Sequence, residues 1–109
     1  MNQTPDVEAD IILLSTAEGG RQMAAFSGYR PAHEVRDNYL TTGVHEYLDC
    51  EKVLPGQTAH GTITFITPEA YPACLWVGKE INIQEGSRVV GKARITKILN
   101  ALLEKRFDA

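Results

Sequence analysis

Three segments alternate between apolar and polar residues with a period of two, which is typical of half-buried β-strands. They span residues 7–14, 58–67 and 88–99. In the second segment the positions expected to face the core are Ala59, Gly61, Ile63 and Phe65. In the third they are Val89, Gly91, Ala93 and Ile95. The alternation of the third segment slips at Lys97, which predicts a bulge or a barrel corner there.

Weaker patterns fill the rest of the chain. Residues 23–29, 74–77 and 80–84 each predict a short strand. Residues 33–50 predict one or two more strands, around 35–40 and 44–48, with Gly43 in the turn between them. Glu85 and Gly86 predict a tight turn, and residues 101–106 predict a helical turn capped by Asn100.

Six to seven short strands joined by Gly and Pro turns, with little helix, indicate a small all-β antiparallel barrel. Small inward residues such as Gly61 and Gly91 favour a barrel over a sandwich, because strands bend sharply where space is tight. We expect a disordered N-terminal tail over residues 1–6, a barrel domain over 7–100, and a C-terminal tail or short helix over 101–109.

Charge changes this picture only locally. The chain of 109 residues carries a net charge of −3, yet its basic residues gather in the second half. Arg88, Lys92 and Arg94 are expected to point outward from one strand, as a basic stripe that contacts either backbone phosphates or a protein partner. The alternative is a solvated strand face whose charges deter edge-to-edge aggregation.

The residues predict no catalytic apparatus. Cys50 and Cys74 make no disulfide framework, and neither thiol has a nearby base in the sequence. The three histidines, His33, His45 and His60, are scattered without metal-ligand spacing, so we expect surface positions for them. The sequence contains no phosphate-binding loop motif, and we expect neither a membrane span nor a signal peptide. We therefore expect a cytoplasmic protein with no cofactor, metal, nucleotide or membrane partner.

Several motifs then resemble one family when they are taken in order. They are ILLS with EGGR at residues 12–21, FSGYRP at 26–31, VLPG at 53–56, and IQEGSRVVG with TKIL at 83–99. Together they resemble the C-terminal (third) domain of translation elongation factor Tu, from about Val7 to Leu99. The resemblance implies a six-stranded antiparallel barrel without catalytic residues, here as a free-standing single domain.

In that family the domain contacts the T-stem of aminoacyl-tRNA, packs on a GTPase domain and helps to bind the nucleotide exchange factor. The tRNA contact carries over to Glu85 and Gly86, which match the family motif. Arg30 matches a residue near an interdomain surface. The sequence departs from the family at residues 32–42, where only Arg36 stays aligned, and it lacks the GTPase domain.

Three further departures alter the face that meets the GTPase domain in the family. Small residues are replaced there by Asn82, Lys92 and Arg94. We therefore expect a module that docks on a protein partner, such as a translation factor. The alternative is binding of a tRNA-like RNA helix through the basic strand, and an enzyme built on a cysteine is the least favoured hypothesis.

Overall fold

The computed structural model describes residues 4–107 and consists mainly of β-strands. The strands are β1 (Val7–Leu13), β2 (Ala25–Phe26), β3 (Ala32–Arg36), β4 (Tyr39–Tyr47), β5 (Lys52–Val53), β6 (Thr58–Phe65), β7 (Glu80–Glu85) and β8 (Arg88–Ile98). There are three single-turn 3₁₀ helices in the described residues: η1 (Thr16–Glu18) between β1 and β2, η2 (Pro68–Ala70) between β6 and β7, and η3 (Ala101–Leu103) after β8. Residues 1–3 of the expected N-terminal tail and residues 108–109 of the expected C-terminal tail lie outside the described range.

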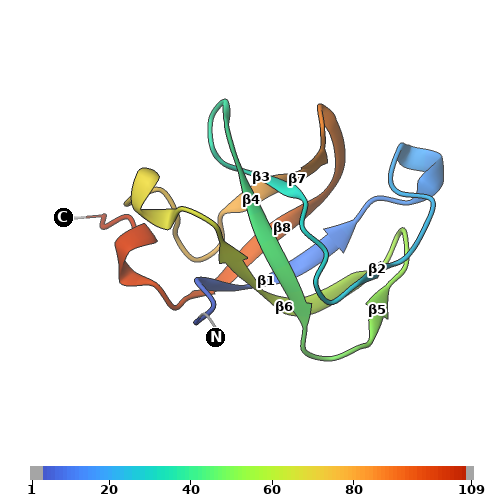
Figure 1. Cartoon of the computed structure of the whole chain (residues 1–109), viewed down its shortest axis with the longest axis horizontal. Coiled ribbons are helices and arrows are strands. Elements are labelled where there is room, and N and C mark those ends of the chain that lie inside the picture. Colours follow the sequence, from blue (N-terminus) through green and yellow to red (C-terminus); the bar gives the residue numbers. More distant parts are fainter. Residues whose placement is uncertain (1–3, 108–109) are drawn as a thin grey trace.

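Six strands close into a barrel in the order β1-β6-β4-β3-β7-β8, and β8 pairs with β1 to complete it (Figure 1). Every neighbouring pair is antiparallel. The all-β, six-stranded antiparallel barrel is therefore confirmed. The remaining two strands, β2 and β5, pair with each other and flank one end of the barrel.

The alternating segments are confirmed as strands, and the residues expected to face the core are buried except Val89 on β8, where Val90 is buried in its place. In β6 the four residues expected inside are all buried, and β1 alternates between buried and half-buried positions along its whole length. These small and branched side chains fill the barrel interior. Glycine is required at Gly91, because a Cβ there would lie 2.5 Å from the carbonyl oxygen of Ile12 on β1.

Two bulges bend β8. The pairing with β1 shifts so that Glu8 faces Lys97 while Ala9 faces Ile95, which leaves Thr96 as the extra residue and confirms the predicted slip. The second bulge was not predicted. It leaves Val90 unpaired with β7, so Val90 is fully buried and Val89 is only half-buried.

The predicted turn at Gly43 is wrong, because Gly43 lies in the middle of the nine-residue strand β4. The turn between β3 and β4 falls instead at Asp37 and Asn38, where Asn38 adopts a positive φ of 60°. Gly43 faces the interior, where a Cβ would lie 2.7 Å from Ile63 and 2.9 Å from the His33 ring. Glycine is therefore needed at position 43 because a larger side chain would not fit there, and not because the chain turns.

The predicted strand over residues 74–77 is also absent, because the chain there makes a single bridge, from Leu75 to Glu104. The predicted helical turn at 101–106 is present as η3, and the Asn100 side chain accepts a hydrogen bond from the amide of Leu102. Leu103 is fully buried, so this turn packs on the molecule. In Figure 1 the η2 and η3 segments lie together at one end of the barrel.

Asp6, the residue before β1, is packed against the barrel. Asp6 is only 5% exposed, and its carboxylate accepts hydrogen bonds from the Phe65 amide (2.7 Å) and the Asn100 side chain (2.8 Å). These contacts join the residue before β1 to the end of β6 and to the segment that follows β8.

Candidate functional site

The basic stripe predicted on β8 is present, but an acidic side chain faces each of its cations. Arg94 lies 2.9 Å from Asp10 on β1, and Lys92 lies 3.9 Å from Glu80 on β7. Arg88 lies 3.5 Å from Glu85. All three basic side chains remain about half exposed. The stripe is therefore one part of a surface of mixed sign.

That surface continues across β1 to β6. His60 lies 3.1 Å from Glu8 and 3.2 Å from Asp10, so the Asp10 carboxylate on β1 lies between His60 on β6 and Arg94 on β8. Hydrogen bonds with Glu8 and Asp10 raise the pKa of His60, and the Arg94 guanidinium, with His60, lowers the pKa of Asp10. We call this surface the charged face and define it as Glu8, Asp10, His60, Glu80, Asn82, Lys92 and Arg94.

Asn82 lies on β7 opposite Lys92 and is half-buried. Its side-chain amide donates to Glu34 on the adjacent strand β3 (3.2 Å). The three residues expected to alter the interdomain face, Asn82, Lys92 and Arg94, thus lie on neighbouring strands of one outer surface, and each is held by an acidic neighbour.

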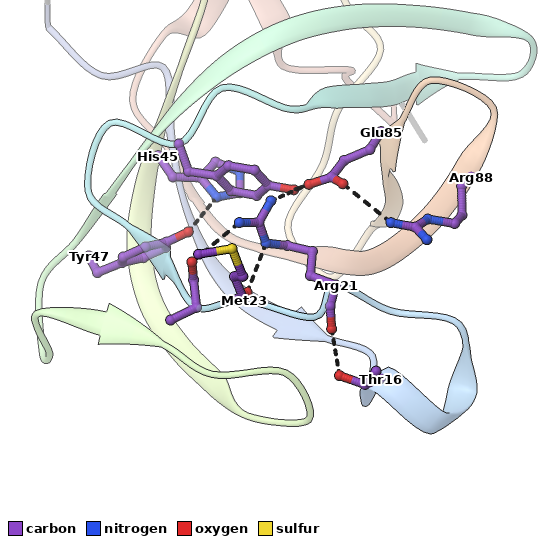
Figure 2. A network of polar contacts seen from close by, with 9 residues as sticks. Thr16, Arg21, Met23, His45, Tyr47, Glu85 and Arg88 are labelled. Atoms are coloured by element: carbon purple, nitrogen blue, oxygen red, sulfur yellow. Dashed lines mark hydrogen bonds and ion pairs between the residues drawn. The ribbon is translucent and has the colours of Figure 1, made fainter.

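The Glu85–Gly86 turn lies directly before the start of β8 at Arg88. Glu85 accepts hydrogen bonds from Arg21 and from the Tyr29 hydroxyl (2.5 Å), and it also faces Arg88, as Figure 2 shows for the two arginines. Burial alone would raise the pKa of Glu85, but the bonds from Tyr29 and Arg21 outweigh it and lower that pKa. Glu85 thus joins the β7–β8 turn to the loop before β2.

Gly86 itself has a φ of 62° and open space around its Cα, so the turn is accessible. Arg30 is exposed in the segment between β2 and β3. No ion pair or hydrogen bond of the Arg30 side chain occurs within residues 4–107. The structure therefore does not bring Arg30 into the network around Glu85.

The predicted surface positions of two histidines are wrong, because His33 and His45 are fully buried in the barrel. Their Nε2 atoms lie 2.7 Å apart, and Nδ1 of His45 lies 3.0 Å from the Tyr47 hydroxyl (Figure 2). Nδ1 of His33 has no partner of hydrogen-bond geometry among the described residues. Burial lowers the pKa of His33 to about 4 and that of His45 well below its usual value, so both rings are neutral near pH 7.

A groove that the sequence did not indicate lies where the β3–β4 turn meets the loop before β7. Its volume is about 470 Å³. It is lined by Arg36, Asp37, Pro72, Ala73, Cys74, Trp76, Lys79 and Lys105. These residues come from three separate segments of the chain, 36–37, 72–79 and Lys105, so no local pattern could have grouped them. We call this feature the Trp76 groove.

Neither thiol forms a nucleophilic site in the described part of the chain. Cys50 is exposed and Cys74 is buried, and desolvation, with Asp49 contributing at Cys50, raises the pKa of both. Residues 4–107 contain no group of three or more side chains arranged to hold a metal ion. No helix in this range is long and apolar enough to cross a membrane. A search against protein-family models found no match.

Proposed function

We propose that this chain is a non-catalytic binding module, related to the C-terminal domain of elongation factor Tu, that docks on a protein partner through the charged face. The closed six-stranded barrel is the fold that the resemblance implies, which supports this proposal. The motifs EGS and VLPG lie at turns beside strand ends, which are accessible positions suited to contacts. A translation-related partner follows from the resemblance.

The observation that carries the proposal is the pairing of the β8 cations. A phosphate backbone is bound by cations that replace its counterions. Arg88, Lys92 and Arg94 each already face a carboxylate within 3.9 Å. A face of alternating sign instead complements another protein face of alternating sign, which fixes the register of the complex and rejects wrong partners.

Site-specific photocrosslinking tests the proposal. A photoreactive residue placed at Asn82, within the charged face, is compared with one placed at the exposed Glu46 on β4, a strand that contributes no residue to the charged face. In lysate treated with nuclease, we expect a discrete protein adduct from position 82 and none from position 46. Charge reversal at Lys92 and Arg94 should remove the adduct.

A parallel titration with tRNA at low salt decides against the alternative. We expect no saturable binding. Binding that weakens steeply with salt and is lost on reversing the same two charges would assign the face to RNA and overturn the proposal. Equal adducts from positions 82 and 46 would also overturn it, because they would show contact without a defined face.

A further inference from the structure

The Trp76 groove differs from the charged face in the balance of its charges. Three of its lining residues are basic, Arg36, Lys79 and Lys105, and only Asp37 is acidic. Within residues 4–107 no carboxylate lies within ion-pair distance of any of the three cations. On a chain of net charge −3, this groove is a local concentration of unpaired positive charge.

Backbone contacts hold the central cation in place. Nζ of Lys79 donates to the carbonyl oxygens of Val35 (2.6 Å) and Cys74 (2.7 Å). An ammonium group has three donors, so one stays available to a ligand. Burial lowers the pKa of Lys79, which is the expected cost of a cation held without a carboxylate. The ammonium group is therefore pre-positioned before any anion arrives.

The aromatic wall of the groove lies beside its cations. Lys79 lies 4.5 Å and Lys105 5.6 Å from the centre of the Trp76 ring, and Phe107 meets the ring edge-on at 5.5 Å. These contacts leave the indole as a side wall and not as an open platform for a stacked base. An apolar wall beside fixed cations suits a ligand that combines negative charges with an apolar side chain.

The number of cations also selects the ligand. Three cations in about 470 Å³ can neutralise two or three carboxylates of one short segment. A nucleic-acid strand would need a longer row of free cations, and the β8 cations that might extend the row are already paired. Arg36 is exposed and presents a guanidinium fork, which matches a carboxylate in a bidentate arrangement.

From this geometry we infer that the Trp76 groove binds an acidic peptide segment of a partner protein, with Asp or Glu side chains facing Arg36, Lys79 and Lys105 and an apolar side chain against Trp76. The inference rests on the proposed protein-docking function and adds a second contact to it. The Ala73 backbone, at a φ of 56°, is held beside the groove by a hydrogen bond to Leu102, which is consistent with a constrained recognition loop.

Trp76 is the single tryptophan of the chain, so its emission reports on the groove directly. The probe is a blocked eight-residue peptide of Asp and Glu with one central Leu. The matched control peptide carries Asn and Gln instead. At low salt we expect a saturable change in Trp76 emission with the acidic peptide, weakened by added salt, and no change with the control peptide.

Two double variants locate the binding. Arg36→Gln/Lys105→Gln removes the two exposed groove cations and should weaken the acidic peptide about tenfold, as expected for two exposed ion pairs. Lys52→Gln/Lys97→Gln removes the same charge from exposed positions outside the groove and should change the affinity less than about twofold. Circular dichroism checks that both variants stay folded.

Several outcomes would overturn the inference. They are no emission change at millimolar peptide, equal losses in the two double variants, and tighter binding of an oligouridine that depends on Arg36 and Lys105. Dimerisation of the chain that the groove variant abolishes would assign the groove to a second copy. The photocrosslink from position 82, measured in the groove variant, separates the two proposals. If the adduct still forms while the acidic peptide no longer binds, the charged face remains a docking surface and only the groove proposal is lost.

Discussion

The three histidines of the barrel lie in two environments that shift their pKa in opposite directions. Inside, His33 and His45 face each other, no carboxylate of residues 4–107 lies within ion-pair distance of either ring, and burial lowers both pKa values. Outside, His60 lies between Glu8 and Asp10, and its pKa is raised. The strand wall thus separates a neutral, hydrogen-bonded histidine pair inside the barrel from a histidine that lies among carboxylates on the outer surface.

The difference shows which region can take part in binding. The interior cluster specifies the packing of β3 against β4 and offers nothing to a ligand, since both rings are fully buried. The outer pairs are exposed, so a partner can exchange one of its charges for an existing one at small net cost. Five predictions test this contrast, and their effects on stability run from the largest to the smallest.

Acid should destabilise the barrel through its interior. The pKa of His33 is about 4 in the folded state and near 6.5 when unfolded, so only the unfolded chain binds a proton between those values. The stability is present above pH 6.5 and falls as the pH drops towards 4, by about 3 kcal/mol from His33. Urea unfolding midpoints at pH 7 and pH 4.5 measure the loss.

The same contrast is visible without unfolding. In NMR titrations, His60 should protonate above its ordinary pKa, while His33 should stay neutral until about pH 4. Simultaneous titration of all three rings near 6.5 would contradict the contrast, because it would place His33 and His45 in contact with solvent.

Substituting Gly43 with alanine should have the next largest effect on the free energy of unfolding. The new methyl group would overlap the His33 ring and Ile63, so we expect a loss of about 2 kcal/mol from overpacking. Thermal unfolding of Gly43→Ala measures it. Wild-type stability in this variant would show that the histidine pair does not depend on the space above Gly43.

Removing the Tyr47 hydroxyl should have a moderate effect. Tyr47→Phe leaves Nδ1 of the buried His45 without its partner at 3.0 Å, which costs about 1–2 kcal/mol. Urea unfolding at pH 7 is the measurement. The ring itself stays in place, so an unchanged midpoint would mean that water replaces the hydroxyl and that the interior is not sealed.

His60→Gln should have the smallest effect, because its ion pairs are partly exposed. A raised folded-state pKa stabilises the fold below the unfolded pKa of about 6.5, and this stability is lost as the pH rises through the folded pKa. The wild type should therefore exceed the variant by about 0.5 kcal/mol at pH 5.5 and match it at pH 9. A difference that persists at pH 9 would have to come from packing.

The sequence predicts which side chains face the barrel interior where their polarity alone decides it. In β6 the small and apolar residues alternate with polar ones, so the inward-facing residues can be identified from the sequence. It failed in β4, where Leu40 and Val44 are the more apolar set but Thr41, Gly43, His45 and Tyr47 face inward. The phase there is set by the space that Gly43 leaves for His33, a contact between strands that no single-strand pattern contains.

The candidate sites divide in the same way. The outward position of Lys92 and Arg94 follows from the alternation of one strand. Their neutralisation depends on Glu80 and Asp10, which reach them only through the barrel register. The Trp76 groove joins the β3–β4 turn to Trp76 and Lys105, and only the closed fold brings those segments together.

The pairing of β1 with β8 has a consequence for how the protein is made. Within the barrel β1 is synthesised before every other strand, yet one of its two edges pairs with β8. Until β8 emerges, the growing chain exposes an unpaired edge that can join to other chains. Synthesis of β8 therefore both completes the barrel and ends its exposure to aggregation, and co-translational folding should complete in one late step.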